Sequence, residues 1–163
     1  MSKSKIMGIM ALIAFAMGMA LAGDAVAGEK FKCRVVWHTT KVERIDVDDE
    51  KGHLLSVSAY KGIMSNMEGK TFGEGWLASM TSIAEIIPKV GMTSYGYIIL
   101  TDKDDHKIYV KYDQKPGGPY PLTIYKGTGK FERVQGKGTF SAFFTADPTR
   151  FYVNWDVEVE LPR

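Results

Sequence analysis

Apolar and polar residues alternate along most of the chain. The last segment, RFYVNWDVEVEL (residues 150–161), gives the clearest case, because its alternate positions form one apolar set: Phe151, Val153, Trp155, Val157, Val159 and Leu161. The intervening positions carry tyrosine, asparagine and three acidic residues. Successive side chains of a β-strand point to opposite faces, so this alternation predicts a half-buried strand with a firm register.

Similar alternating runs recur at short spacing. They are CRVVWHTTKVERIDV, HLLSVSAYKGI, TFGEGWLAS, YGYIILTD, KIYVKYD, YPLTIYKG and GTFSAFFTA, and short polar segments such as DDEKG and KDDH separate some of them. About eight strands with such connections predict an all-β antiparallel barrel or sandwich. The segment SMTSIAEIIPKVGM differs, because Ile83, Ile86 and Ile87 have helical spacing. It predicts one short helical turn or a structured loop near residues 83–87.

The first 27 residues have the layout of a secretory signal peptide. Lys3 and Lys5 precede a nearly continuous apolar run over residues 6–22, and AVA at residues 25–27 offers small residues for a peptidase. The small residues before the site favour cleavage after Ala27 over an uncleaved membrane anchor. We therefore expect a bacterial protein that is periplasmic or secreted, with one domain over residues 28–163 and no stable membrane insertion after cleavage.

The charge balance excludes some classes of partner, and the cysteine count excludes an internal disulfide. The whole chain has a formal net charge of +2 at pH 7, and removal of residues 1–27 brings it closer to zero. Such a balance gives no electrostatic footprint for nucleic acid or for an anionic membrane. Cys33 is the one cysteine, so no internal disulfide forms, and we expect it to pack as a small buried side chain.

The segment IYKGTGKFERVQGKGTF (residues 124–140) contains four glycines among basic and aromatic residues. A phosphate-binding P-loop requires G-x-x-x-x-G-K-[ST], but Gly138 stands where Ser or Thr belongs and Phe131 stands at the first glycine. The flanking segments are strands on both sides, whereas a phosphate loop joins a strand to a helix. We interpret the glycines as positions where the sheet turns and bends.

The same segment, in the form GTGKFERVQGKGTF, resembles the G-G-x-G-x-F-x-x-x-x-G signature of the allene oxide cyclase and dirigent protein barrels. The resemblance covers about residues 97–144, and it departs from the signature at Lys126, where the first glycine is expected. The chain also resembles exported bacterial proteins with GYxxLTD and a closing tryptophan strand. The resemblance implies a single antiparallel eight-stranded barrel, calycin-like, and it leaves a homo-oligomer open.

Aromatic residues on the predicted strands suggest what the barrel does. An eight-stranded barrel is filled by its side chains or holds one small ligand, and Tyr and Trp supply apolar rings with a polar atom. We predict that the protein binds a small apolar or aromatic molecule in its interior. The candidate ligand-binding residues are Trp37, Tyr60, Trp76, Tyr95, Tyr97, Tyr109 and Trp155.

Two alternatives remain open at this stage. The first is a cofactor-free isomerase or cyclase of the allene oxide cyclase kind, with Glu74 in FGEGWL as its candidate acid or base and Tyr95 or Tyr97 as hydrogen-bond donors. Glu74 alternates with Phe72 and Trp76 and so could face an apolar interior, but Gly73 and Gly75 could form a bulge that turns it outward. The second is a filled barrel that acts through its surface or by self-assembly. The histidines have no metal-binding spacing, and no cofactor or metal is expected.

Overall fold

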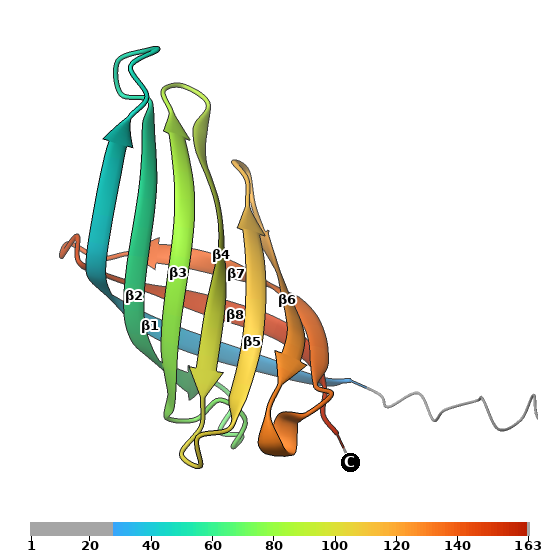
Figure 1. Ribbon diagram of the computed structural model, residues 1–163. Coiled ribbons are helices and arrows are strands. Elements are labelled where there is room, and N and C mark those ends of the chain that lie inside the picture. Colours follow the sequence, from blue (N-terminus) through green and yellow to red (C-terminus); the bar gives the residue numbers. More distant parts are fainter. Residues whose placement is uncertain (1–27, 163) are drawn as a thin grey trace, which may run out of the picture.

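Eight strands form in the predicted order (Figure 1), but the third covers residues 76–87 and not the predicted 71–79. The computed structural model describes residues 28–162, so the predicted signal peptide lies outside the described residues. The strands are β1 (Glu29–Asp46), β2 (Leu54–Asn66), β3 (Trp76–Ile87), β4 (Gly91–Thr101), β5 (Lys107–Gln114), β6 (Tyr120–Gly127), β7 (Gln135–Phe144) and β8 (Arg150–Glu160). A 3-10 helix, η1 (Gly129–Phe131), follows β6. In the described part of the chain, no helix is long and apolar enough to cross a membrane.

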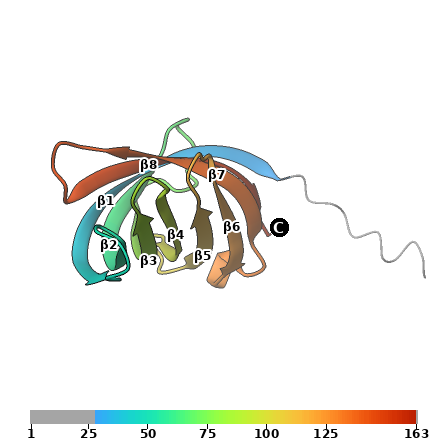
Figure 2. The ribbon, with the colours of Figure 1, turned by 90° about the horizontal axis from the view of Figure 1, so that it is seen from above.

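Each strand pairs antiparallel with the next, and β8 pairs with β1 to close the barrel. Figure 2 shows β2 to β6 curving around the interior, while β7, β8 and the first part of β1 pass across the opposite side. The closing register places Val35 opposite Val153 and Cys33 opposite Trp155, so that apolar residues of both strands share the inner face. The prediction of an all-β barrel of eight antiparallel strands is confirmed.

Strand β8 has the faces that its sequence predicts. Val153, Trp155, Val157 and Val159 are buried, whereas Asp156, Glu158 and Glu160 are exposed. Each inner residue removes apolar surface from water, which contributes about 25 cal/mol per Å². The alternation of β8 therefore fixes which face of the closing strand lines the interior.

The expectation of a short helix near residues 83–87 is wrong. These residues form the end of β3, and Pro88 lies in the tight connection to β4. Ile83 and Ile86 pair with Tyr95 and Met92 of β4, so the isoleucines lie on a sheet. Isoleucine is β-branched and favours a strand, and the pairing partners on both sides of β3 override the weak helical spacing.

The glycine-rich segment lets β7 approach β8 closely and lets β6 approach η1 closely. A Cβ atom on Gly138 would lie 2.2 Å from the carbonyl oxygen of Asp156, and one on Gly127 would lie 2.1 Å from the carbonyl oxygen of Phe131. Only a residue without a side chain fits at such approaches. Between these glycines η1 returns the chain to β7, which agrees with the structural interpretation of the segment.

The barrel interior consists of two halves. We call the end with the β2–β3 and β4–β5 connections and η1 the closed end, and the end with the β1–β2, β3–β4 and β5–β6 turns the open end (Figure 1). The closed half is filled by fully buried side chains: Cys33, Val35, Met64, Leu100, Ile108, Val110, Ile124, Val157 and Val159. Burial raises the pKa of the Cys33 thiol to about 12, with a smaller contribution from the nearby charges of Glu68 and Glu74.

Candidate functional site

A cavity of about 150 Å³ lies in the open half of the barrel. Seven strands contribute to its lining, which comprises Trp37, Tyr60, Met80, Ser82, Ala84, Met92, Ser94, Ile98, Tyr112, Gln114, Phe140, Ala142, Phe144, Phe151, Val153 and Trp155. Phe144 is 74% exposed, so the cavity reaches the surface at this end. The interior is thus neither wholly filled nor wholly open.

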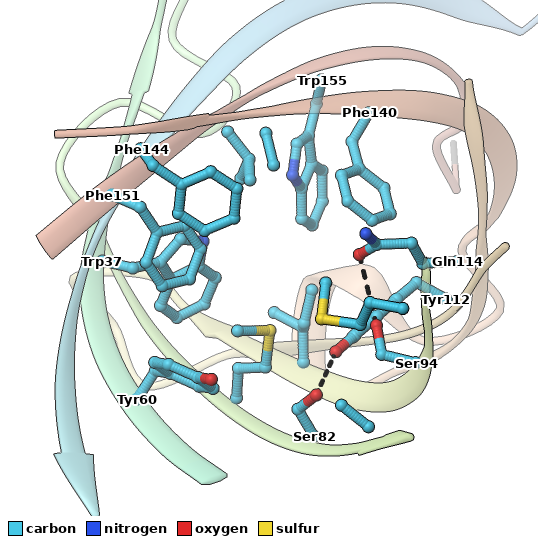
Figure 3. Close-up of a pocket in the computed structure, with 16 residues that line it drawn as sticks. Trp37, Tyr60, Ser82, Ser94, Tyr112, Gln114, Phe140, Phe144, Phe151 and Trp155 are labelled. Carbon is cyan, nitrogen blue, oxygen red and sulfur yellow. Dashed lines mark hydrogen bonds between the residues drawn. The ribbon is translucent and has the colours of Figure 1, made fainter. Parts of the chain in front are cut away.

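Aromatic rings form one wall of the cavity. Figure 3 shows Trp37, Phe144, Phe151, Phe140 and Trp155 around one side, with Tyr60 below them. Tyr60 meets Phe151 edge-on, at 5.3 Å between ring centroids. Such edge-to-face pairs hold aromatic rings in a defined orientation.

Trp37 fits into this wall because its partner on β2 is a glycine. Gly62 lies directly opposite Trp37, and a Cβ atom on Gly62 would come within 2.9 Å of the Trp37 ring. The ring therefore covers the glycine, an arrangement in which an aromatic residue shields the exposed backbone of its cross-strand neighbour.

Hydroxyl and amide groups form the opposite wall (Figure 3). The Tyr112 hydroxyl donates to Ser82 Oγ at 2.7 Å, and the Ser94 hydroxyl donates to Gln114 Oε1 at 3.2 Å. Burial raises the pKa of the Tyr112 phenol. Its hydrogen bonds to serine lower the pKa, but by a smaller amount. Tyr112 is therefore a neutral phenol at physiological pH, and its proton is directed to Ser82.

Gly96 makes room for Tyr112 in the same way as Gly62 does for Trp37. The two residues are opposite one another on β4 and β5, and a Cβ atom on Gly96 would lie 2.7 Å from the Tyr112 ring. Trp37 and Tyr112 thus each depend on a glycine in the neighbouring strand.

None of the residues that line the cavity is an acid, a lysine, an arginine or a histidine. An unpaired charge buried in such surroundings would be very unfavourable, since nothing in the wall would compensate it. The lining therefore suits a neutral molecule with an apolar body and a few hydrogen-bonding atoms.

The structure brings together three of the seven predicted ligand-binding residues. Trp37, Tyr60 and Trp155 line the cavity. Trp76 is buried at the closed end, where its ring lies 4.9 Å from that of Phe72 and 5.2 Å from that of Phe131. It belongs to the aromatic packing of the closed end, where it borders a separate pocket together with Glu74, and it does not reach the cavity.

Tyr95, Tyr97 and Tyr109 require a correction, because they lie on the outer face of the barrel. Tyr95 and Tyr97 are 54% and 58% exposed, and Tyr109 packs against Tyr125 outside the sheet, at 6.5 Å between centroids. On β4 the buried positions are Ser94, Gly96, Ile98 and Leu100. Burial of Ile98 and Leu100 fixes the face of the strand, so the intervening tyrosines must point outward.

Glu74 also lies away from the cavity. It is exposed in the β2–β3 connection at the closed end, and its Oε2 accepts a hydrogen bond from the backbone N–H of Asn66 at 2.9 Å. Gly73 and Gly75 both adopt positive φ angles, 79° and 69°, which break the strand alternation at this point. The glycines therefore turn Glu74 outward, and the predicted acid or base does not face the interior.

Sequence reasoning missed the polar wall and part of the aromatic wall. The residues concerned are Ser82, Ser94, Tyr112, Gln114, Phe140, Phe144 and Phe151. A signal was present in the alternation of β4 and β5, where Ser94 and Tyr112 share the inner face with Ile98 and Val110. A polar residue in phase with buried apolar positions indicates a polar group inside the barrel.

A second group of polar residues lies at the closed end. Lys130 Nζ is 2.6 Å from Asp102 Oδ2, and the backbone N–H groups of Asp104 and His106 each donate to Asp102 Oδ1 at 2.9 Å. Burial alone would raise the pKa of Asp102, but these hydrogen bonds outweigh it and hold the pKa well below its ordinary value.

This group ties the β4–β5 turn to η1. One ligand atom from each of Asp102, Asp104 and His106 lies within 4.8 Å of the others, a spacing that a metal ion could use. The ammonium group of Lys130 already contacts both carboxylates, at 2.6 Å and 3.5 Å. We therefore assign the group to the structure of the closed end.

The strands form a closed eight-stranded antiparallel barrel, and its fold is similar to that of dirigent proteins. No protein-family model and no curated protein matches the chain. Among solved structures, it is similar to the pterocarpan synthase dirigent protein PsPTS1, with a TM-score of 0.53 and 13% identity over 84% of this chain and 98% of that chain. It is also similar to the pterocarpan synthase dirigent protein GePTS1, with a TM-score of 0.54 and 11% identity over 88% of this chain and 94% of that one.

At such identities the likeness concerns the fold alone. The dirigent-like barrel implied by the glycine-rich segment is confirmed at that level. The relation to the allene oxide cyclases and the bacterial, exported origin stay predictions.

Proposed function

We propose that this chain is an exported barrel protein that binds one small, neutral, apolar or aromatic molecule in the open half of its interior. The observation that carries the proposal is the cavity of about 150 Å³, which combines aromatic rings with hydroxyl and amide groups and has no charged side chain in its lining. Apolar cavities of about this size admit a benzene-sized molecule. Export is supported by the signal-peptide pattern of residues 1–27.

The alternative of a cofactor-free isomerase or cyclase lacks the acid or base that was nominated for it, because Glu74 is exposed at the closed end. The cavity's own hydrogen-bonding groups are hydroxyls, an amide and indoles. Neutral groups of this kind position a ligand, so binding is the function that the geometry supports best.

The test is a filling variant with a matched control. Ala84 lines the cavity, whereas Thr81 lies on the outer face of the same strand. Indane, a neutral molecule with one aromatic ring, should raise the melting temperature of the wild type and of Thr81→Phe. Ala84→Phe should lose this stabilisation, because its new ring occupies the binding space.

Loss in Thr81→Phe alone, or an indane effect that persists in Ala84→Phe, would show that the molecule binds elsewhere. No binding of indane or of a wider panel of neutral aromatic molecules to the wild type would contradict the proposal. Native mass spectrometry of protein from its own host would then identify any molecule that copurifies.

A further inference from the structure

The two tryptophans of the cavity have indole N–H groups without a protein partner. Trp37 and Trp155 are only 1% and 2% exposed, yet no hydrogen bond from either indole nitrogen occurs among the described residues. Every fully buried polar side-chain atom of residues 28–162 does have a partner. The two N–H groups are therefore not enclosed by protein. Both residues line the cavity (Figure 3), and Trp155 also borders a second pocket beside Lys32 and Asn154.

The other polar groups of the cavity add further donors, while the hydroxyl oxygens also keep acceptor lone pairs. The Tyr112 and Ser94 hydroxyl protons are used within the opposite wall, by Ser82 and by the side-chain oxygen of Gln114. The Gln114 amide nitrogen, which makes no hydrogen bond within the described chain, adds further donors near the mouth. An indole N–H only donates, and an amide nitrogen only donates.

We infer that the ligand is a neutral ring compound that carries a carbonyl oxygen, which accepts hydrogen bonds from the indole N–H groups of Trp37 and Trp155. This inference rests on the proposed function and specifies the chemistry of that same cavity. A carbonyl oxygen has two lone pairs and no proton, so it suits a wall that offers donors. A carboxylate would also accept, but it would bring a buried charge that no cationic side chain of the lining could neutralise.

A matched series of small molecules tests the carbonyl. Indane, 1-indanol and 1-indanone share one fused ring system and differ only at one position. We expect 1-indanone to bind the wild type about tenfold more tightly than indane, because it satisfies buried donors that indane leaves unpaired. We expect 1-indanol to fall between them, since its hydroxyl also accepts but brings a proton that needs its own acceptor.

Variants then assign the donors. Trp37→Phe and Trp155→Phe keep an aromatic ring and remove the N–H, so each should reduce the preference for 1-indanone over indane. Trp76→Phe is the matched control, because Trp76 lies among Phe72 and Phe131 at the closed end. It should keep the tenfold preference.

NMR on the wild type provides a readout that does not depend on whether a variant folds. The chain has three tryptophans and therefore three indole N–H signals. Saturation with 1-indanone, compared with indane, should move the signals of Trp37 and Trp155 downfield and leave that of Trp76 in place.

The outcomes separate the inference from the proposed function. If indane and 1-indanone bind equally well, or if the two cavity indoles show no downfield movement, the inference is overturned while the proposed function stands. A preference that survives in folded Trp37→Phe/Trp155→Phe protein also overturns it. If none of the three molecules binds the wild type, the proposed function itself fails.

Discussion

The closed and open halves of the barrel are built from the same eight strands but have different interiors. In the closed half, Met64, Leu100 and Ile108 are almost wholly buried and leave no cavity among them. In the open half, the inward positions of the same or neighbouring strands hold Ser82, Ser94 and Ala84, whose short side chains leave space between the aromatic rings. The size of the inward-facing residues at each depth of the barrel therefore decides whether that part is a packed core or a binding cavity.

The comparison also shows how polar groups are tolerated inside a barrel. In the open half, Ser56 and Ser58 are buried and hydrogen-bond to each other at 3.2 Å, as Ser82 does with Tyr112. Buried polar groups cost little when they are paired. The closed half keeps its polar interactions at the rim, where Asp102 meets Lys130 and two backbone N–H groups.

The largest expected difference between the halves concerns two methionines. Met64 is fully buried in the closed half, and Met92 lines the cavity. Met64→Ala should lower the free energy of unfolding by about 2–5 kcal/mol, because it opens a cavity in packed surroundings. Met92→Ala should cost less than about 1 kcal/mol, because its surroundings are already open. Equal costs in urea denaturation would mean that the two halves do not differ in packing.

The glycine opposite Tyr112 should be almost as sensitive. A Cβ atom on Gly96 would lie 2.4 Å from the Thr81 carbonyl oxygen and 2.7 Å from the Tyr112 ring. Gly96→Ala should therefore lower the free energy of unfolding by about 1–3 kcal/mol through overpacking, and it should weaken indane binding by displacing Tyr112. Thr93→Ala, on the outer face of the same strand, is the control. An unchanged melting temperature for Gly96→Ala would contradict the close approach.

Loss of the ion pair at the closed end should lower the free energy of unfolding by as much as Gly96→Ala does, or by less. Asp102→Asn should lower the free energy of unfolding by about 1–3 kcal/mol, because it weakens the hydrogen bonds to Lys130 and to the β4–β5 turn. Asp105→Asn, at a side chain that is 80% exposed, should change it little.

The pH dependence of this contribution has a definite sign. The pKa of Asp102 is lowered in the folded protein, so its stabilisation is present above the unfolded value of about 3.9 and is lost as the pH falls through the folded value. The wild type should therefore lose more stability in acid than Asp102→Asn does. Parallel acid curves for the two proteins would rule out this role of the carboxylate.

The smallest expected effect is at the β1–β2 turn of the open end. His53 lies between Asp49 and Glu85, at 2.6 Å and 3.1 Å. The hydrogen bond to Asp49, opposed by burial and aided by Glu85, raises the pKa of His53 above its ordinary value. Its stabilisation is thus present below about pH 6.5 and is lost as the pH rises through the raised value. An NMR titration of the imidazole should give a pKa above the ordinary histidine value of about 6.5.

Much of the fold could be predicted from sequence, because alternation is a local property. The run in residues 150–161 specifies both the strand and its inner face, and Val153, Trp155, Val157 and Val159 are buried as expected. Residues 83–87 could not be assigned in this way, because their strand character depends on pairing with β2 and β4. Local spacing contains no information about those distant partners.

The site was less accessible to sequence reasoning than the fold. Trp37, Tyr60 and Trp155 were found because aromatic residues on strands are candidates for a lining. Residue type alone did not separate the inner Tyr112 from the outer Tyr95 and Tyr97. The alternation of β4 around Ile98 and Leu100 places Tyr95 and Tyr97 outside, and the alternation of β5 around Val110 places Tyr112 inside. Phase could not exclude Trp76, because Trp76 does point into the barrel. It lies at the closed end, and the depth of a residue along the barrel depends on how the strands are staggered.

The most direct test of a half-open interior is a crystal structure of the protein under xenon pressure. Xenon enters apolar cavities that are large enough and stays out of packed cores. We predict xenon density among Trp37, Tyr60, Met80 and Phe151 in the open half, and none among Met64, Leu100 and Ile108. An interior without xenon, or xenon bound in the closed half, would contradict the account.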